Sequence, residues 1–244
     1  MRRFFINSPL APEILITGDD VRHIGKVLRM QVGDSCVVVA PDGSAAVAVI
    51  KSITSSEVML SLTAVIDDNK EPPVKIILVQ GLPKSDKMDY IVQKAVELGV
   101  YKVIPMHAAH SVVQYTDQKK AARVERWQKI AAEAAKQCRR SLIPQISNIQ
   151  SLHEVLSSLE GKAEIIMLYE GQTKVRLRDI LTMSHAEAIA IIVGPEGGFS
   201  DEEVGLASRR GAAIATMGPR ILRTETASVA AVAAVMYACG DLGG

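Results

Sequence analysis

The sequence is poor in the residues that build disulfide frameworks and metal centres. Its three cysteines, Cys36, Cys138 and Cys239, lie about a hundred residues apart, and no C-x-x-C pair occurs, so neither a disulfide scaffold nor a zinc site is predicted. The five histidines are scattered as well. His107 and His110 are three apart, but they lie in a stretch that resembles strand and loop, which favours ordinary histidines over metal ligands. We therefore expect no metal.

The chain also lacks a long uncharged stretch. The longest, Thr226 to Gly240, has 15 residues, whereas a membrane-spanning helix needs roughly 17–25 apolar residues. The apolar opening, residues 4–6, is interrupted by Asn7 before it reaches the length of a signal peptide. We therefore expect a cytosolic protein. With 48% hydrophobic and 23% charged side chains over 244 residues, the composition suits one large globular domain or two modest ones.

Phosphate-binding glycine motifs and base-stacking motifs are missing too. Neither G-x-x-x-x-G-K-[ST] nor G-x-G-x-x-G occurs. The aromatics are one Trp, five Tyr and three Phe, without an RNP-type motif. The net charge of +1 hides an asymmetry, because residues 119–140 hold eight Lys/Arg and two Glu, which leaves the remainder at −5. A basic block on a mildly acidic body predicts an anionic partner at one place.

The N-terminal part of the chain has the pattern of a small β-rich domain. Pro41-Asp42-Gly43 is a turn sequence between two apolar runs. A short basic helix is expected after Asp19 or Asp20, either of which would cap it. The simplest picture is a small barrel with one basic helix, followed by a polar linker over residues 67–73. Strands are expected over residues 35–40, 45–51 and 57–65.

After the linker, short apolar strands alternate with longer helical stretches, the pattern of an α/β domain with a parallel sheet covered on both faces. Strands are expected over residues 74–79, 102–106, 164–169, 188–193 and 213–217. Helices are expected over residues 85–98, 118–142, 151–159, 201–210 and 226–239. The last of these helices is Ala/Val on nearly every side, so we expect it to be buried all round, within one subunit or against a symmetry mate.

Three consecutive strand ends carry glycines, acids and arginines, at the edge of the sheet where ligands bind in such folds. They are Leu168–Gly171, Gly194–Phe199 and Met217–Thr226. The middle loop allows close backbone approach to a ligand, because three of its six residues lack Cβ. An alternative is a tight turn closed by a Ser200/Glu203 capping box. The acids here would repel a phosphate, so a cofactor with a cationic centre fits better.

Two groups of basic residues each leave two interpretations open. Arg220 and Arg223 suit planar contact with a phosphate or a base edge, or else they pair with Glu225 or Glu196 and hold the loops together. The basic helix has an apolar stripe that includes Trp127, and its opposite side is either a solvated face or a track for phosphates. The cations of that side are Arg126, Lys129, Lys136 and Arg140.

The chain resembles the RsmE family, the methyltransferases of the SPOUT superfamily that act on N3 of a uridine in 16S ribosomal RNA of the small subunit. Its most specific motifs are VGPEGGF at Val193–Phe199 and MGPRILRTETA at Met217–Ala227. The other matching segments are residues 2–5 (RRFF), 23–30 (HIGKVLRM), 93–100 (QKAVELGV) and 125–136 (ERWQKIAAEAAK). The chain departs from the family at Arg22, where a second histidine is expected before His23.

The resemblance implies a fold, a cofactor and partners. The fold would be a C-terminal SPOUT α/β sheet domain with a deep trefoil knot over residues 74–244, preceded by a small PUA-like β-barrel domain that binds RNA over residues 1–70. The cofactor would be S-adenosyl-L-methionine. The protein would act in the cytoplasm as a homodimer on 16S rRNA within the small ribosomal subunit. The alternatives are the same chemistry on another RNA, such as tRNA, or a non-catalytic RNA-binding factor for ribosome assembly.

The resemblance also implies roles for residues at the strand ends and on the basic surfaces. Arg223 would stabilise the uridine anion, and Glu225 would accept the proton or orient Arg223. Cofactor contacts are expected from Leu168, Tyr169, Glu170, Gly194, Glu196, Gly198, Met217, Gly218, Ile221, Leu222 and Thr226. RNA contacts are expected from Arg2, Arg3, Arg22, His23, Lys26, Arg29, Arg126, Lys129, Lys136 and Arg140.

Overall fold

The computed structural model describes residues 1–112, 115–171 and 173–243, and the chain divides into two compact units. The first unit comprises Met1–Glu71 and Ala135–Ile143, and the second comprises Pro72–Ala134 and the chain from Pro144 onward. This differs from the expected division in residues 135–143, which the sequence assigns to the second domain. The reason is a set of polar contacts: backbone N–H groups of Ser141 and Leu142 each donate to Glu71 Oε1 at 3.0 Å.

The first unit is a five-stranded sheet with the order β1-β3-β4-β5-β2. Strands β3, β4 and β5 form an antiparallel meander, and β1 pairs with β3 in parallel. The predicted turn between β3 and β4 is present, with Gly43 at a φ of +85°. The hydrogen-bonded path is open between β1 and β2, so the expected barrel is not closed by a ladder there. The strands are β1 (Arg3–Phe5), β2 (Glu13–Thr17), β3 (Ser35–Val39), β4 (Ala45–Ile53) and β5 (Glu57–Ile66).

The predicted basic helix of this unit is irregular. It begins as α1 (Asp19–Arg22) and continues as a π-helical turn, η1 (His23–Val27). The expected cap is wrong, because Gly18 occupies the capping position and no side chain caps the helix. The two candidate aspartates lie instead in the first turn, where their charge still complements the helix dipole. Ile24 is fully buried under this helix.

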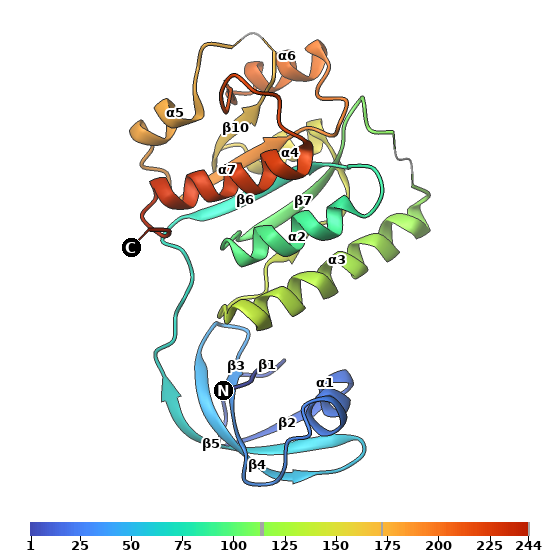
Figure 1. The fold of residues 1–244 in the computed structure, drawn as a ribbon, viewed down its shortest axis with the longest axis vertical. Coiled ribbons are helices and arrows are strands. Elements are labelled where there is room, and N and C mark those ends of the chain that lie inside the picture. The colour runs from blue at the N-terminus through green and yellow to red at the C-terminus, as the bar shows by residue number, and fades with distance from the viewer. Residues whose placement is uncertain (113–114, 172, 244) are drawn as a thin grey trace. The chain divides into compact units, whose positions relative to one another are not determined.

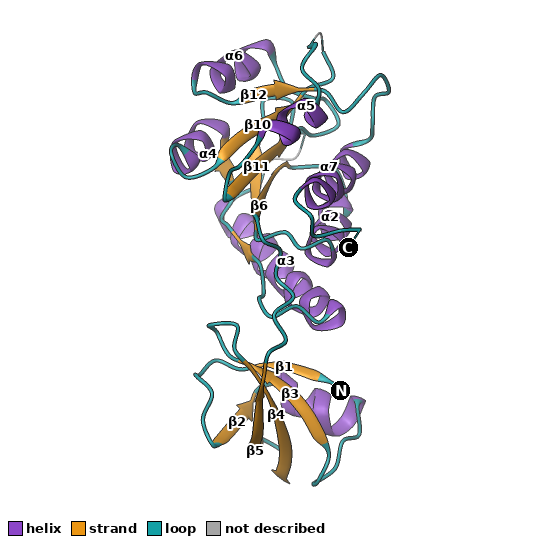
Figure 2. Ribbon diagram, turned by 90° about the vertical axis from the view of Figure 1, so that its left-hand side faces the viewer, coloured by secondary structure: helices purple, strands orange, loops and turns teal. Residues whose placement is uncertain are grey.

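The second unit is built on a seven-stranded parallel sheet with the order β12-β10-β11-β6-β7-β8, and β9 also pairs with β7. Figure 2 shows α4 and α6 on one side of this sheet and α2 and α7 on the other, which confirms the predicted α/β layers. Its strands are β6 (Lys75–Gly81), β7 (Lys102–His107), β8 (Gln145–Ile146), β9 (Gln150–Ser151), β10 (Glu164–Leu168), β11 (Ala188–Val193) and β12 (Ala213–Ala215). The helices are α2 (Lys87–Glu97), α3 (Asp117–Cys138), α4 (Leu152–Leu159), α5 (Leu177–Met183), α6 (Asp201–Arg209) and α7 (Thr224–Ala238).

Helix α3 ends earlier than predicted, and α5, β8 and β9 were not expected. The helix predicted to run to residue 142 ends at Cys138, because Arg139 adopts a φ of +62° that no α-helix continues through. None of the helices in the described part of the chain is both long and apolar enough to cross a membrane.

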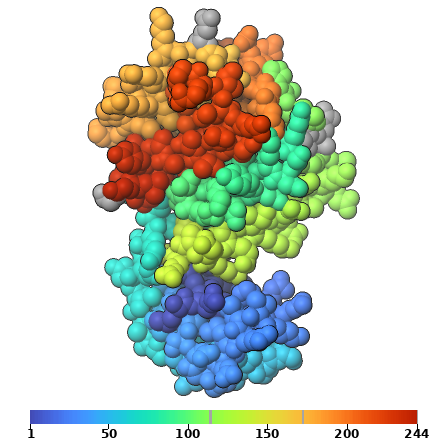
Figure 3. Space-filling model, in the orientation of Figure 1, coloured from blue at the N-terminus to red at the C-terminus, as the bar shows by residue number. Residues whose placement is uncertain are grey.

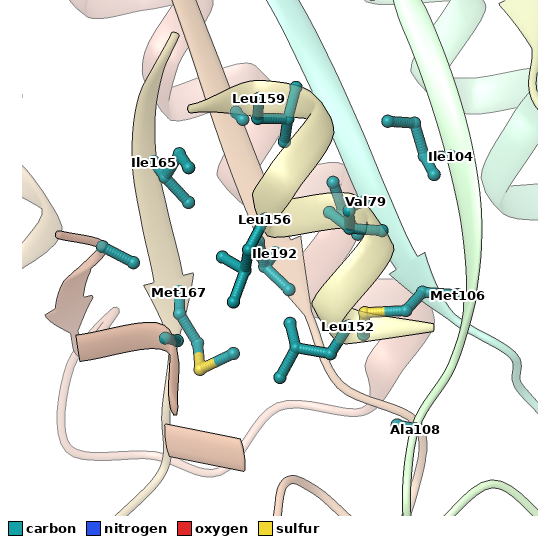
Figure 4. Close-up of a cluster of buried hydrophobic side chains, with 14 of the residues drawn as sticks. Val79, Ile104, Met106, Ala108, Leu152, Leu156, Leu159, Ile165, Met167 and Ile192 are labelled. Atoms are coloured by element: carbon teal, nitrogen blue, oxygen red, sulfur yellow. The ribbon is translucent and has the colours of Figure 1, made fainter. Parts of the chain in front are cut away.

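One hydrophobic cluster of the second unit lies between α4 and the sheet, and α2 and α7 bury further apolar side chains on the opposite face. Along α4, Leu152 and Leu156 lie near Met167 of β10 and Ile192 of β11, and Leu159 lies at the end of the helix near Ile165 (Figure 4). A Ser151/Glu154 capping box starts this helix. Strand β11 is apolar along its whole length, and β10 is apolar after Glu164, because both faces of these strands are covered.

Helix α7 packs against α2 and the sheet by one side only (Figure 1). Its inner residues are fully buried, among them Ser228, Val232 and Val235. Burial all round within one subunit is not found, because Tyr237 is 72% exposed and the outer side of α7 forms open surface in Figure 3, whereas burial against a symmetry mate stays a prediction. Ala and Val cover both sides of the helix, so the sequence alone could not tell the packed side from the open one.

The connection from β10 to β11 passes outside β12. The backbone N–H of Thr216, just after β12, donates to the Val175 carbonyl at 2.9 Å, and the Leu177 N–H donates to the Thr216 carbonyl at 3.0 Å. On its other side β12 pairs with β10. The chain that leaves β12 for α7 therefore starts between β10 and this outer connection.

Candidate functional site

A cavity of about 390 Å³ lies where β10, β11 and β12 end, at the sheet edge that the sequence singled out. Its size is within the range of small-molecule sites, roughly 300–1,000 Å³. The cavity lies within the second unit and is lined by Lys87, Leu168, Tyr169, Glu170, Val193, Gly194, Pro195, Glu196, Gly198, Thr216, Met217, Gly218, Pro219, Arg220, Ile221, Leu222, Arg223, Thr224 and Ala227.

The glycine-rich loop after β11 is both a tight turn and a cavity wall. The Gly198 N–H donates to the Pro195 carbonyl at 3.0 Å, and the predicted Ser200/Glu203 capping box is present at the start of α6. Gly198 has a φ of +66°, and a Cβ there would collide with the carboxylate of Glu170. Glycine at this position therefore suits the positive φ of the turn and leaves room for the Glu170 carboxylate beside it.

Lys87 joins two carboxylates at the cavity. Its Nζ lies 2.9 Å from Glu196 Oε1 and 3.1 Å from Glu225 Oε2. The backbone N–H of Lys84 also donates to Glu196, at 3.2 Å from either oxygen. The contacts with Glu196 and, second, with Glu225 raise the pKa of Lys87.

Both carboxyl groups have a lowered pKa. For Glu196, burial acts in the opposite direction, but the Lys87 hydrogen bond, backbone N–H groups and the lysine charge outweigh burial. For Glu225, burial is outweighed by its own backbone N–H, by Lys87 and by the charge of Arg223. The two groups are therefore ionised at neutral pH. Glu225 Oε2 is buried and makes an ion-pair contact with Lys87 without a well-directed hydrogen bond.

Arg220 and Arg223 are exposed side chains in the cavity wall. Arg223 has an extended backbone and immediately precedes α7. The proposal that these arginines pair with Glu225 or Glu196 is wrong, since Lys87 pairs with both carboxylates. Within the described ranges neither arginine forms an ion pair, which leaves two guanidinium groups available to an anionic or planar ligand.

A buried amide links the strand ends below the cavity. Gln80, at the end of β6, donates from Nε2 to Thr224 Oγ1 at 3.0 Å, and the Thr224 hydroxyl donates to the Gly194 carbonyl at 2.6 Å. The Ser228 hydroxyl bonds to Gln80 Oε1. All three side chains are at least 96% buried, so this network fixes the start of α7 against the β11 loop.

Ten of the eleven residues predicted to contact a cofactor line the cavity. Thr226 is the exception, because it is exposed and does not contribute to the lining. Tyr169 lines the cavity with its hydroxyl 3.3 Å from Asp201, and its pKa is raised by desolvation and by that carboxylate. Of the two residues predicted to be catalytic, Arg223 lines the cavity. Glu225 is not part of the lining, but it forms an ion pair with Lys87, which is.

Two of the residues predicted to contact RNA are structural instead. Arg3 is buried, donates to the Arg140 carbonyl at 2.9 Å and pairs with Asp68. Arg140 is also buried and pairs with Glu71. Both guanidinium groups hold the linker end of the first unit, so we remove them from the predicted RNA surface. A run of like charges in the sequence does not show which members have buried partners.

The other predicted RNA residues lie at or near the surface. Arg2, Arg22, Lys26 and Arg29 are exposed on the first unit, and His23 beside them is half-buried. Along α3, each of the three remaining residues that were predicted to contact RNA has an acidic neighbour. Arg126 pairs with Asp89, Lys129 lies 2.8 Å from Glu125, and Lys136 lies 2.9 Å from Asp20. The predicted apolar stripe is confirmed at Trp127, Ala131 and Ala134, which are buried, but its last predicted member, Leu142, lies beyond the end of α3.

Sequence reasoning missed Lys87 and Gln80. Lys87 follows the end of β6, the neighbour of β11 in the sheet, so applying the strand-end rule to a fourth strand would have found it. Gln80 was visible as the single amide that ends an otherwise apolar run. In the described part of the chain no three His, Cys, Asp or Glu side chains are placed to hold a metal ion. His110 lies beside the glycine loop, with Nδ1 2.9 Å from the Gly197 carbonyl.

Comparison with known proteins places this site in a family. Residues 70–236 match the RNA methyltransferase domain model, and residues 16–62 match the RNA methyltransferase PUA domain model. The chain is 34% identical to ribosomal RNA small subunit methyltransferase E of Bacillus subtilis, over 97% of this chain and 96% of that one. The corresponding protein of Buchnera aphidicola is 32% identical over 98% and 94%.

A solved structure agrees with these sequence matches. The Neisseria gonorrhoeae ribosomal RNA small subunit methyltransferase E, crystallised with S-adenosyl methionine, superposes with a TM-score of 0.87 at 30% identity, over 96% of each chain. The resemblance seen in the VGPEGGF and MGPRILRTETA motifs is thus confirmed over nearly the full length. The chain belongs to the ribosomal RNA small subunit methyltransferase E (RsmE) family, with an RNA methyltransferase domain and a PUA-like domain.

Proposed function

We propose that the protein transfers a methyl group from S-adenosyl-L-methionine to N3 of a uridine in 16S ribosomal RNA of the small subunit. Membership of the RsmE family supports this proposal, as does the cofactor bound to the Neisseria relative. The observation that carries it is the cavity at three strand ends, where acidic groups face inward and Arg223 has no ion-pair partner within the described ranges. That combination suits a cationic cofactor beside a substrate that becomes an anion.

The residues of the cavity fit S-adenosyl-L-methionine. The cofactor carries a sulfonium cation and no phosphate, so the acids at the start of α6, which would repel a nucleotide phosphate, do not oppose it. Glu170 and Glu196 supply negative charge, and Leu168, Val193 and Leu222 supply apolar wall for the adenine. When bound, the cofactor supplies an electrophilic methyl group.

The chain's own residues would position the uridine and stabilise its charge. N3 of uridine is a weakly acidic imide that becomes nucleophilic when it loses its proton, and alignment with the methyl group supplies much of the rate acceleration. The Arg223 guanidinium would stabilise the imide anion. A carboxyl group with a lowered pKa is a poor proton acceptor, so we assign Glu225 to charge balance beside Arg223 rather than to proton abstraction.

The assembly that we propose has three further features. The open, Ala/Val-rich side of α7 would pack against a second chain in a homodimer. The chain from β12 to α7 would thread the outer β10–β11 connection to form a deep trefoil knot, which the backbone bonds of Thr216 support. The first unit, as a PUA-like domain, would bind RNA through Arg2, Arg22, Lys26 and Arg29. The enzyme would act in the cytoplasm on the small subunit.

The decisive experiment has two parts. Calorimetric titration with S-adenosyl-L-methionine, and with ATP as control, tests the cavity. Transfer of labelled methyl to small subunits from cells that lack the modification tests the reaction, with tRNA as a competing substrate. A methyl on N3 blocks base pairing, so a reverse-transcription stop maps the uridine. Binding of the cofactor followed by a single new stop in 16S rRNA is expected. The proposal would be overturned if the protein bound no cofactor either alone or in the presence of RNA.

A further inference from the structure

Lys87 occupies a place that the proposed chemistry does not yet use. It lies at the first position of α2, lines the cavity and contacts Glu196 and Glu225 at 2.9 and 3.1 Å. Its side chain is 31% exposed, and those of Glu196 and Glu225 are 26% and 19% exposed. Ion pairs that are this far from solvent are less screened than surface pairs.

Without Lys87, the charge balance of the cavity would change. Glu225 lies two residues after Arg223 at the start of α7, close enough for the arginine charge to lower its pKa. Glu196 in the cavity wall and Glu225 beside it would then lack the lysine, and the cation nearest in sequence to Glu225 is Arg223, whose guanidinium forms strong forked pairs with carboxylates. An arginine held in such a pair has its donors occupied and cannot serve an imide anion equally well.

We propose that Lys87 is a positioning residue: by pairing with Glu196 and Glu225 it keeps Arg223 unpaired and available to the uridine, a role that rests on the proposed methyl transfer. Lys87 itself does not touch the substrate in this arrangement. The fixed cation neutralises one carboxylate in advance, so that the site need not rearrange when the substrate loses its proton.

The test is a mutant cycle on kcat with small subunits as substrate. Lys87→Met keeps the length of the side chain and removes its charge; we expect kcat to fall about 10- to 100-fold while KM for S-adenosyl-L-methionine does not rise. Lys87→Arg, which keeps the charge, is expected to stay within about threefold of the wild type. Adding Glu225→Gln to Lys87→Met removes the competing carboxylate and is expected to raise kcat above that of Lys87→Met alone.

The control is Lys94→Met on the same helix. Lys94 pairs with Glu97 at 2.8 Å and is 34% exposed, a close match to Lys87, but it does not line the cavity. We expect its kcat to equal that of the wild type. The proposal is overturned if Lys87→Met keeps its kcat, or if the double variant is no more active than Lys87→Met. If Lys87→Met does not fold by circular dichroism, Lys87→Gln replaces it in the same cycle.

A second readout does not depend on turnover. In protein labelled with ¹⁵N-arginine, the Nε–H resonance of Arg223, assigned by its loss in Arg223→Lys, reports on its hydrogen bonding. We expect it to shift in Lys87→Met and to return toward the wild-type position when Glu225→Gln is added. An unchanged resonance in Lys87→Met would overturn the proposal. If the wild type methylates no RNA, the proposed function fails, and this measurement still decides whether Lys87 keeps Arg223 unpaired.

Discussion

Replacement of Gln80 by leucine tests whether the buried amide holds the site together. The side chain is fully buried and donates to the Gly81 carbonyl at 2.8 Å and to Thr224 Oγ1 at 3.0 Å. Leucine has a similar size but no polar atoms. The Thr224 hydroxyl would keep its bond to Gly194, and Ser228 would keep its bond to the Thr224 carbonyl. The groups that lose a donor are the Gly81 carbonyl and Thr224 Oγ1, so the change leaves one or two buried acceptors short of a partner. At about 1–3 kcal/mol each, we expect the second unit to lose about 2–4 kcal/mol of its free energy of unfolding.

Trp127 makes this loss measurable. It is the single tryptophan of the chain and is buried in the second unit, so its fluorescence during urea unfolding reports on that unit. In thermal unfolding followed by the same fluorescence, a loss of about 2–4 kcal/mol corresponds to a fall in Tm of roughly 5–15 °C. The control is Gln93→Leu, an exposed amide on α2 that should change stability by less than about 0.5 kcal/mol. If Gln80→Leu is no more damaging than Gln93→Leu, the amide does not support the strand ends.

Three further changes test the cavity and the RNA surface. Arg223→Ala should lower kcat by about 100-fold and leave the calorimetric Kd for the cofactor within about threefold; unchanged turnover would remove Arg223 from the mechanism. Gly198→Ala should weaken cofactor binding about tenfold, because a φ of +66° strains any residue with a Cβ and the added Cβ would displace the Glu170 carboxylate from the cavity wall; intact binding would show that the loop adjusts. Replacing Arg22 and Lys26 by glutamine should reduce the salt dependence of RNA binding, by up to about 0.9 in slope per lost phosphate contact; the same slope as the wild type would exclude this helix from the RNA surface.

The parallel sheet and the place of the site could be predicted from the sequence because both depend on local patterns. Apolar runs without alternation mark strands covered on both faces, and every strand predicted after the linker is present within a few residues. The strand-end rule then placed the site at the loops after β10, β11 and β12, where the cavity lies, and the family resemblance supplied the eleven expected cofactor contacts, of which ten line it. Helix α5 was missed because its seven residues make fewer than two helical turns, which is too short for an apolar period to be recognised. Its apolar residues, Leu177, Ile180 and Leu181, do have helical spacing.

The roles of individual charges could not be predicted, because they depend on partners far away in the sequence. Arg140 and Arg223 each stand in a basic segment that suits contact with RNA. In the folded chain Arg140 is buried against Glu71, which is 69 residues away, and has become structural. Arg223 has a carboxylate only two positions on, yet Lys87 at the start of α2 pairs with that carboxylate. An exposed arginine beside an acid that is already paired is therefore better evidence of function than a cluster of basic residues, and it can be recognised only in the structure.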